Sequence, residues 1–118
     1  MSGSHSRTKG HSFERWVAKQ LRTIWVNAKR GYQTRGGTQE QFDVEGTPFA
    51  IECKVGKQPN IRAAMRQVEA ACKGKPPVVV SKVDRETPLV TMHFNDWLAL
   101  VAAVYGKVES DDSVQEVQ

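Results

Sequence analysis

The most informative segment of the chain is Phe42-Asp43-Val44-Glu45-Gly46-Thr47-Pro48-Phe49-Ala50-Ile51-Glu52-Cys53-Lys54-Val55. Residues 45–48 include the turn formers glycine and proline, so residues 42–44 and 49–55 are predicted to be the two strands of a hairpin. Side chains alternate between the two faces of a strand, which places Glu52 and Lys54 together on one face with Ala50. The other face is apolar: Phe49, Ile51, Cys53 and Val55.

A helix is predicted before the hairpin, from about Gly10 to Ala28. Its apolar residues recur at helical spacing and form one stripe, interrupted only by Gln20: Phe13, Trp16, Val17, Leu21, Ile24 and Trp25. Gly31 is expected to end this helix after Lys29 and Arg30, because cations suit a helix C-terminus. A flexible basic loop, residues 34–38, then leads to the hairpin.

Two strands and two helices are predicted after the hairpin. Residues 61–72 form a helix whose buried stripe is Ile61, Met65, Val68 and Cys72. Val78-Val79-Val80 is an unbroken apolar run, which is typical of a central strand covered on both faces, and residues 88–94 form the next strand. Asn95, a good N-cap, is expected to open a last apolar helix from Asp96 to about Tyr105.

The predicted order of elements is therefore αββαββα. A hairpin followed by a crossover helix and a further strand implies a mixed β-sheet flanked by helices, in the α/β class. A length of 118 residues with 39% apolar residues suits one domain, which we expect to span residues 9–108. Residues 1–8 are expected to be a flexible N-terminal segment, and residues 109–118 an acidic flexible tail.

The formal net charge of +4 is unevenly distributed along the chain. Residues 1–75 contain 14 Lys and Arg against 6 Asp and Glu, whereas residues 76–118 contain 3 against 7. The positive charge therefore lies with the hairpin, where it would hold phosphate groups and make binding sensitive to salt.

The cysteines and the apolar stretches of the sequence indicate where in the cell the protein is expected. Cys53 and Cys72 lack the spacing of a zinc or redox site and are interpreted as free thiols. The longest apolar stretch, residues 97–105, is far too short to cross a bilayer, and no secretory leader opens the chain. We therefore expect a soluble, cytoplasmic protein with no membrane partner.

Asp43, Glu52 and Lys54 form a candidate catalytic group. Cleavage of a phosphodiester needs a hard cation that neutralises the phosphate and lowers the pKa of an attacking water, and such cations prefer carboxylate oxygens. Asp43 and Glu52 lie on neighbouring strands, where cross-strand side chains come within roughly 5 Å of each other. The Lys54 ammonium could orient or deprotonate the water, or stabilise developing negative charge.

An ordinary alternative exists for each of these residues. Glu52 and Lys54 could belong to a solvated strand face, and Asp43 to a turn. The context favours a site, because Asp43 precedes Glu52 across a Gly-Pro turn, with one helix before the hairpin and a basic helix after it.

From about Lys9 to Val83 the pattern resembles the PD-(D/E)XK nuclease superfamily, whose core has a helix, a hairpin carrying Asp and Glu-x-Lys, another helix and a further strand. The resemblance implies that Asp43 and Glu52 are metal ligands and that Lys54 is the catalytic lysine. The proline that usually precedes the aspartate is replaced here by Phe42.

Within that superfamily the chain is most similar to archaeal-type Holliday junction resolvases and their phage relatives. Those enzymes begin with Lys-Gly-x-x-x-Glu-Arg, matched here by residues 9–15, and have an Arg with a small Gly/Ser segment before the Asp, matched by residues 35–38. The likeness implies that Glu14 contributes to the metal site and that Arg15 and Arg35 contact the DNA backbone. An acid in the first turns of a helix is also stabilised by the helix dipole, so Glu14 has an ordinary explanation too.

Other residues near the site are candidate DNA contacts or supports. The full set of predicted DNA-binding residues is Lys9, Arg15, Arg30, Arg35, Lys57, Arg62 and Arg66. Related nucleases often carry a Gln on the helix after the lysine, which makes Gln67 a possible supporting residue, although a solvated Gln is the equal alternative.

The resemblance implies a Mg²⁺-dependent endonuclease, with Mn²⁺ as a substitute, that cuts four-way (Holliday) junctions in recombination and repair. Paired cuts in a two-fold symmetric junction need two active sites, so we expect a homodimer bound to branched DNA. The last helix, residues 96–105, is more apolar than a surface helix should be, and either core or interface explains it. The alternatives are another PD-(D/E)XK nuclease, of nicking or restriction type, and a non-catalytic DNA-binding module.

Overall fold

The computed structural model describes residues 2–31 and 42–106. The helices in these ranges are α1 (Ser2–Leu21), α2 (Ile61–Ala71) and α3 (Phe94–Tyr105). The strands are β1 (Lys29–Arg30), β2 (Val44–Glu45), β3 (Ala50–Val55), β4 (Pro77–Lys82) and β5 (Leu89–Met92). They form a sheet in the order β1-β2-β3-β4-β5, in which β3 and β4 are parallel and the other neighbours are antiparallel. The predicted mixed sheet of a restriction-endonuclease-like fold is confirmed.

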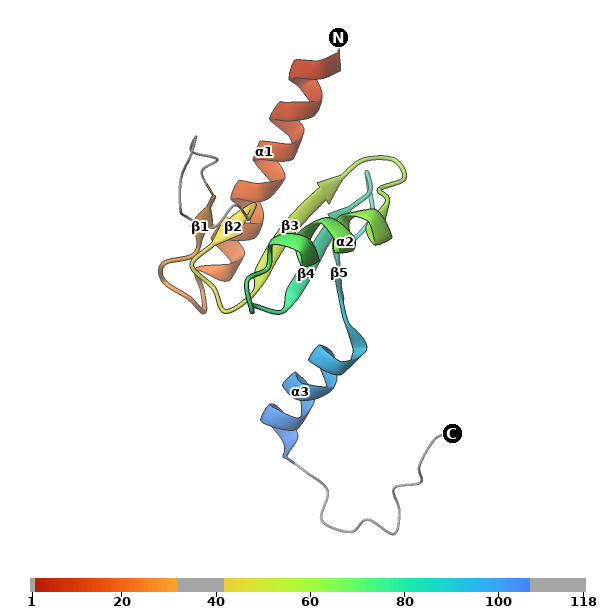
Figure 1. Ribbon diagram of the computed structural model, residues 1–118. Helices are drawn as coiled ribbons and strands as arrows, with labels where there is room; N and C mark the ends of the chain where they lie inside the picture. The colour runs from red at the N-terminus through yellow and green to blue at the C-terminus, as the bar shows by residue number, and fades with distance from the viewer. Residues whose placement is uncertain (1, 32–41, 107–118) are drawn as a thin grey trace.

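Helices α1 and α2 cover opposite faces of the sheet (Figure 1). The alternation predicted for β3 produces this arrangement, because Ile51 and Cys53 pack with Phe13 and Val17 of α1 while Ala50 belongs to the core under α2. Strand β4 contributes to both cores in the same way and is buried on both faces, as the unbroken valine run predicted. Glu52 and Lys54 therefore lie on the α2 side of β3, by alternation from Ala50.

Helix α2 is the crossover connection between the parallel strands β3 and β4. Asn60 is its N-cap, and the side-chain oxygen of Asn60 accepts a hydrogen bond of 3.0 Å from the backbone N–H of Ala63. Met65 and Val68 are buried as predicted, and Cys72 lies just beyond the helix as its C-cap.

The prediction that the first helix runs from about Gly10 to Ala28 was wrong at both ends. The helix begins at Ser2 and ends at Leu21, after which residues 22–28 form turns. Three β-branched residues, Thr23, Ile24 and Val26, follow the end of the helix, and such residues lose side-chain freedom in helices. The Arg22 guanidinium donates a hydrogen bond of 2.9 Å to the carbonyl of Ala28, which closes this segment.

Lys29 and Arg30, interpreted as the end of that helix, instead form the edge strand β1. They pair antiparallel with Glu45 and Val44 of β2. The order within residues 2–31 and 42–106 is therefore αβββαββα, with one strand more than predicted.

The last helix was predicted with Asn95 as its N-cap, which is also wrong. Helix α3 begins at Phe94, and its N-cap is His93, which makes no side-chain capping hydrogen bond. None of the residues of α3 is buried, so the helix is not part of the core of its own chain. Figure 1 shows α3 projecting from the end of β5, away from the sheet.

Within the described ranges, no helix has both the length and the apolar character needed to cross a membrane. The division into a flexible segment at 1–8, a domain at 9–108 and an acidic tail at 109–118 stays a prediction, and the tail lies outside the described residues.

Candidate active site

Asp43 directly precedes β2, at the open end of the hairpin that β2 and β3 form. Its carboxylate Oδ2 accepts a hydrogen bond of 2.8 Å from the backbone N–H of Cys53 on β3. This bond extends the contact between the strands beyond the paired residues Val44 and Ile51. One oxygen of Asp43 is thereby held against β3 at Cys53, the residue between Glu52 and Lys54.

Glu52 and Lys54 lie on the same face of β3, as strand alternation predicted. The Lys54 ammonium is 3.7 Å from Glu52 Oε2. The Glu52 side chain is only 13% exposed, whereas the Lys54 side chain is 37% exposed. The pair therefore consists of a largely buried acid and a lysine that reaches solvent.

Glu14 approaches the same site from α1. Its Oε1 accepts a hydrogen bond of 2.9 Å from Nε of Arg30, and both side chains are partly buried. Arg30 was predicted as a DNA contact; the structure places it on the edge strand β1 with Glu14 as its partner. The sequence did not indicate this pairing, because Arg30 was interpreted as the end of a helix.

Asp43 and Glu52 are difficult to ionise together. Burial is the main cause that raises the pKa of Glu52 to about 7, and the negative charge of Asp43 adds to it, while Lys54 acts in the opposite direction. Burial also raises the pKa of Asp43, although the hydrogen bond from Cys53 opposes this shift. Glu14 contributes to both increases, so its charge also acts on this site.

Asp43 and Glu52 are a candidate pair of ligands for a divalent cation. Bound between them it would offset the burial and repulsion that raise both pKa values. In the part of the chain that the structure describes, no group of three or more His, Cys, Asp and Glu side chains could hold a metal ion. With two protein carboxylates, water and phosphate oxygens would supply the remaining ligands, as is usual for Mg²⁺.

Cys53 is not a candidate nucleophile, although it adjoins both acids. Its thiol is buried, and burial together with the neighbouring carboxylates raises its pKa strongly. Cys53 contributes to the site through its backbone N–H, which no side-chain pattern in the sequence could indicate.

A pocket of about 340 Å³ next to the site has three lysines in its lining. They are Lys9 of α1, Lys54 of β3 and Lys57 of the loop that follows β3, and Asp84 lies with them. Lys9 forms an ion pair of 2.8 Å with Asp84, whereas Lys57 is exposed. The predicted contacts Lys9 and Lys57 are thus brought together with the catalytic candidate Lys54.

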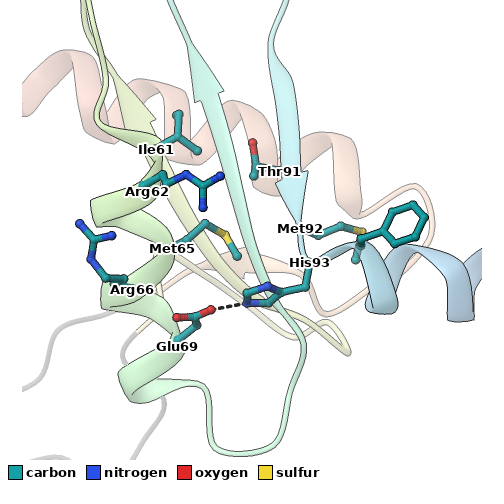
Figure 2. A pocket seen from close by; sticks show the side chains of 9 residues that line it. Ile61, Arg62, Met65, Arg66, Glu69, Thr91, Met92 and His93 are labelled. Atoms are coloured by element: carbon teal, nitrogen blue, oxygen red, sulfur yellow. Dashed lines mark hydrogen bonds and ion pairs between the residues drawn. The ribbon is translucent and has the colours of Figure 1, made fainter. Parts of the chain in front are cut away.

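The other predicted DNA contacts lie elsewhere. Arg62 and Arg66 line a different pocket, between α2 and β5, which also contains a hydrogen bond between Glu69 and His93 (Figure 2). Arg15 is exposed on α1, and Gln67 is exposed on α2. Arg35 lies outside the described residues.

Comparison with known proteins identifies the family. A family model described as "Phage putative PDDEXK endonuclease" matches residues 5–116. No curated protein and no solved structure matches the chain. Nucleases of the PD-(D/E)XK type generally use divalent metal ions such as Mg²⁺, which agrees with two partly buried carboxylates near a lysine. Since the match covers nearly the whole sequence, the chain belongs to the phage PD-(D/E)XK endonuclease family.

Proposed function

We propose that this endonuclease resolves four-way DNA junctions, by metal-dependent hydrolysis of phosphodiester bonds in paired cuts. The observation that carries the catalytic part is the pair of carboxylates, Asp43 and Glu52, which are partly buried near Lys54 and have raised pKa values. Such a pair of acids is costly unless a cation is bound, and perturbed acids in a cleft are typical of functional sites.

Asp43 and Glu52 would hold the metal ion, with Mg²⁺ as the proposed ion and Mn²⁺ as a substitute. When bound, the metal neutralises the phosphate charge and lowers the pKa of the attacking water. Asp43 is held in place by the N–H of Cys53, so one carboxylate is oriented before any ligand arrives. Glu14, paired with Arg30, would act at the edge of the site and position that metal.

Lys54 would act on the reacting phosphate. Its ammonium lies near Glu52 yet is partly exposed, so it can reach a bound phosphate without being fully desolvated. As a cation it would stabilise the negative charge that develops in the transition state, and its N–H groups would orient the attacking water.

The lysine-lined pocket would hold the DNA backbone next to the cleaved bond. Lys57 is exposed there, and Lys9 is held by Asp84, an interaction that a phosphate would replace. Phosphate contacts of this kind fix the position of DNA without reading its sequence. Arg15, Arg35, Arg62 and Arg66 remain proposed contacts for the more distant arms of a branched substrate.

The junction as substrate rests on the likeness of residues 9–15 to the resolvase pattern and on the need for two sites. A homodimer would supply one site for each of the two cuts. We propose that it acts in the cytoplasm of the host cell.

One assay separates this proposal from its alternatives. The full-length protein is incubated with a labelled four-way junction, plain duplex and single strands, each with Mg²⁺ or with EDTA. Symmetric Mg²⁺-dependent cuts near the junction centre support resolution. Equal cutting of plain duplex contradicts it and favours a nicking or restriction-type nuclease. Salt-sensitive binding of the junction without cleavage of any substrate favours a DNA-binding module.

A further inference from the structure

The sheet face that carries α1 is only partly covered. Helix α1 packs against β1, β2 and β3, and beside it a groove of about 360 Å³ remains. Apart from Gln20, its lining is apolar, with Trp16 and Leu21 from α1 on one side and Val80 and Val90 from the sheet beneath. No charged residue lines the groove, so it would gain little from contact with water or DNA.

Helix α3 has a surface of the same character. Trp97, Leu100, Val101 and Val104 recur at i, i+3, i+4 and i+7 and so share one face. Asp96 is the only charged residue in the helix, and no residue of α3 is buried. A continuous apolar surface of this kind on a soluble chain indicates an interaction site.

We propose that α3 of a second copy of this chain fills the groove, and that the exchange is reciprocal. Each protomer would offer one apolar helix and one apolar groove, so two copies would satisfy both surfaces in a closed two-fold dimer. Leu100 of α3 already lines the groove of its own chain, so this helix and this groove are chemically compatible.

The connection between β5 and α3 favours a second copy over closure on the same sheet. A single residue, His93, separates Met92 of β5 from Phe94 of α3, and its backbone is extended, with φ −66° and ψ 143°. Connections in which a helix turns back over its own sheet usually have about 2–6 residues. The short extended connection instead carries α3 outward from β5 (Figure 1), and short connections of this kind favour exchange between protomers.

The area available is of the size that a stable dimer needs. Phe94, Trp97 and Tyr105 are 67%, 47% and 81% exposed. With about 150–250 Å² for each aromatic side chain, these three residues alone offer roughly half of the ~800 Å² per partner that a standard interface buries. The exposed parts of Leu98, Leu100 and Val104 on α3, and the walls of the groove, add to this area.

The exchange would leave the candidate active site open. The groove lies on the α1 face of the sheet, whereas Glu52 and Lys54 lie on the α2 side of β3. The proposed function supplies only the reason for a dimer, since paired cuts need two sites. It is therefore tested in the absence of DNA and metal, so that either conclusion can fail alone.

The first test measures the mass of the full-length protein by sedimentation equilibrium over a range of concentrations. We expect a dimer, and Trp97→Asp should weaken it by at least about 30-fold, as at a central tryptophan of an interface. Val26→Asp is the matched control: Val26 is 80% exposed and lies outside the groove, so this variant should remain dimeric. Circular dichroism would establish that both variants keep their helices. A monomeric wild type, or a Trp97→Asp variant that dimerises normally, overturns the proposal.

The second test locates α3 by cross-linking. In a Cys72→Ser background, a tagged chain with Gln20→Cys in the groove is mixed with an untagged chain with Val104→Cys on α3, and a short bismaleimide is added. We expect a covalent pair of one tagged and one untagged chain, and no pair from the Cys72→Ser parent. If a chain that carries both cysteines is linked only within itself, α3 closes on its own sheet and the exchange is contradicted.

Discussion

The carboxylate of Asp43 accepts a hydrogen bond of 2.8 Å from the backbone N–H of Cys53, the residue between Glu52 and Lys54. One acid of the candidate site is thus attached to the strand that carries the other acid and the lysine. The spacing of the three groups is therefore set by the hairpin itself. This relationship allows each group to be tested by a substitution that preserves the hairpin.

Glu52→Gln should stabilise the metal-free protein at alkaline pH. The pKa of Glu52 is about 7 in the folded chain, above its ordinary value of 4.5. The folded state therefore holds the proton more tightly than the unfolded state, and stability falls as pH rises from about 4.5 to 7. Removing the charge should increase the free energy of unfolding on the order of 2 kcal/mol at pH 8.5, after allowance for solvent screening. The melting temperature in EDTA measures this gain.

The gain should be much smaller at pH 5, where Glu52 of the wild type is already protonated in the folded chain. Added Mg²⁺ at pH 8.5 should raise the melting temperature of the wild type and not that of Glu52→Gln. Glu86→Gln, at an exposed position, is the matched control. It should change neither the melting temperature at pH 8.5 nor its increase on addition of Mg²⁺. An equal melting temperature for wild type and Glu52→Gln at both pH values would contradict the burial of an ionised acid at this position.

Lys54→Met should remove cleavage while leaving the fold intact. The ammonium is partly exposed and its loss costs little packing, but the developing charge on the phosphate loses its cation. We expect the single-turnover cleavage rate to fall by a factor of about 100 or more, with junction affinity changed only slightly. Lys19→Met, on the exposed side of α1, is the control. Comparable rates for Lys54→Met and Lys19→Met would remove Lys54 from the reaction.

The structure confirms the parts of the fold that depend on regular patterns. Strand alternation placed Glu52 and Lys54 on one face, and the run Val78-Val79-Val80 indicated a strand buried on both sides; both follow from a period that the sequence displays directly. The end of α1 was missed because the apolar spacing continues to Ile24 and Trp25. Helical spacing cannot distinguish a last helical turn from a turn that packs its apolar residues on the same core.

The partners within the site could be predicted only in part. Asp43, Glu52 and Lys54 could be proposed as one group because their spacing depends on one hairpin. The pairing of Glu14 with Arg30 joins α1 to an edge strand of two residues, which has no pattern of its own. The exposure of α3 also could not be predicted from the sequence, since an apolar helix fits a core and an interface equally well.

Glu14→Gln should weaken the dependence on metal without abolishing cleavage. Glu14 contributes to the raised pKa values of Asp43 and Glu52, yet its carboxylate is bonded to Arg30. We therefore expect the Mg²⁺ concentration at half-maximal rate to rise by about 10–100-fold, the range typical of residues that position metal ligands. A maximal rate recovered at high Mg²⁺ supports this role, whereas complete loss of cleavage at all Mg²⁺ concentrations would make Glu14 a direct ligand instead.

Lys57→Ala should weaken DNA binding uniformly across sequences. Lys57 is exposed in the lysine-lined pocket beside Lys54, where it would contact a phosphate. The slope of log affinity against log salt concentration should become shallower by roughly one unit, as for one lost phosphate contact. Lys73→Ala, at an exposed position outside that pocket, is the control and should retain the wild-type slope. An unchanged slope for Lys57→Ala would place the DNA elsewhere.

The most direct test of the catalytic site compares cleavage and binding for Asp43→Asn. The amide oxygen of an asparagine can still accept the hydrogen bond from Cys53, so the hairpin should be preserved while one negative ligand is lost. With a labelled four-way junction and Mg²⁺, we predict that Asp43→Asn binds as the wild type does but cleaves at least about 100-fold more slowly, whereas Asp96→Asn on α3 cleaves normally. Cleavage by Asp43→Asn at the wild-type rate would contradict the assignment of the active site to this hairpin.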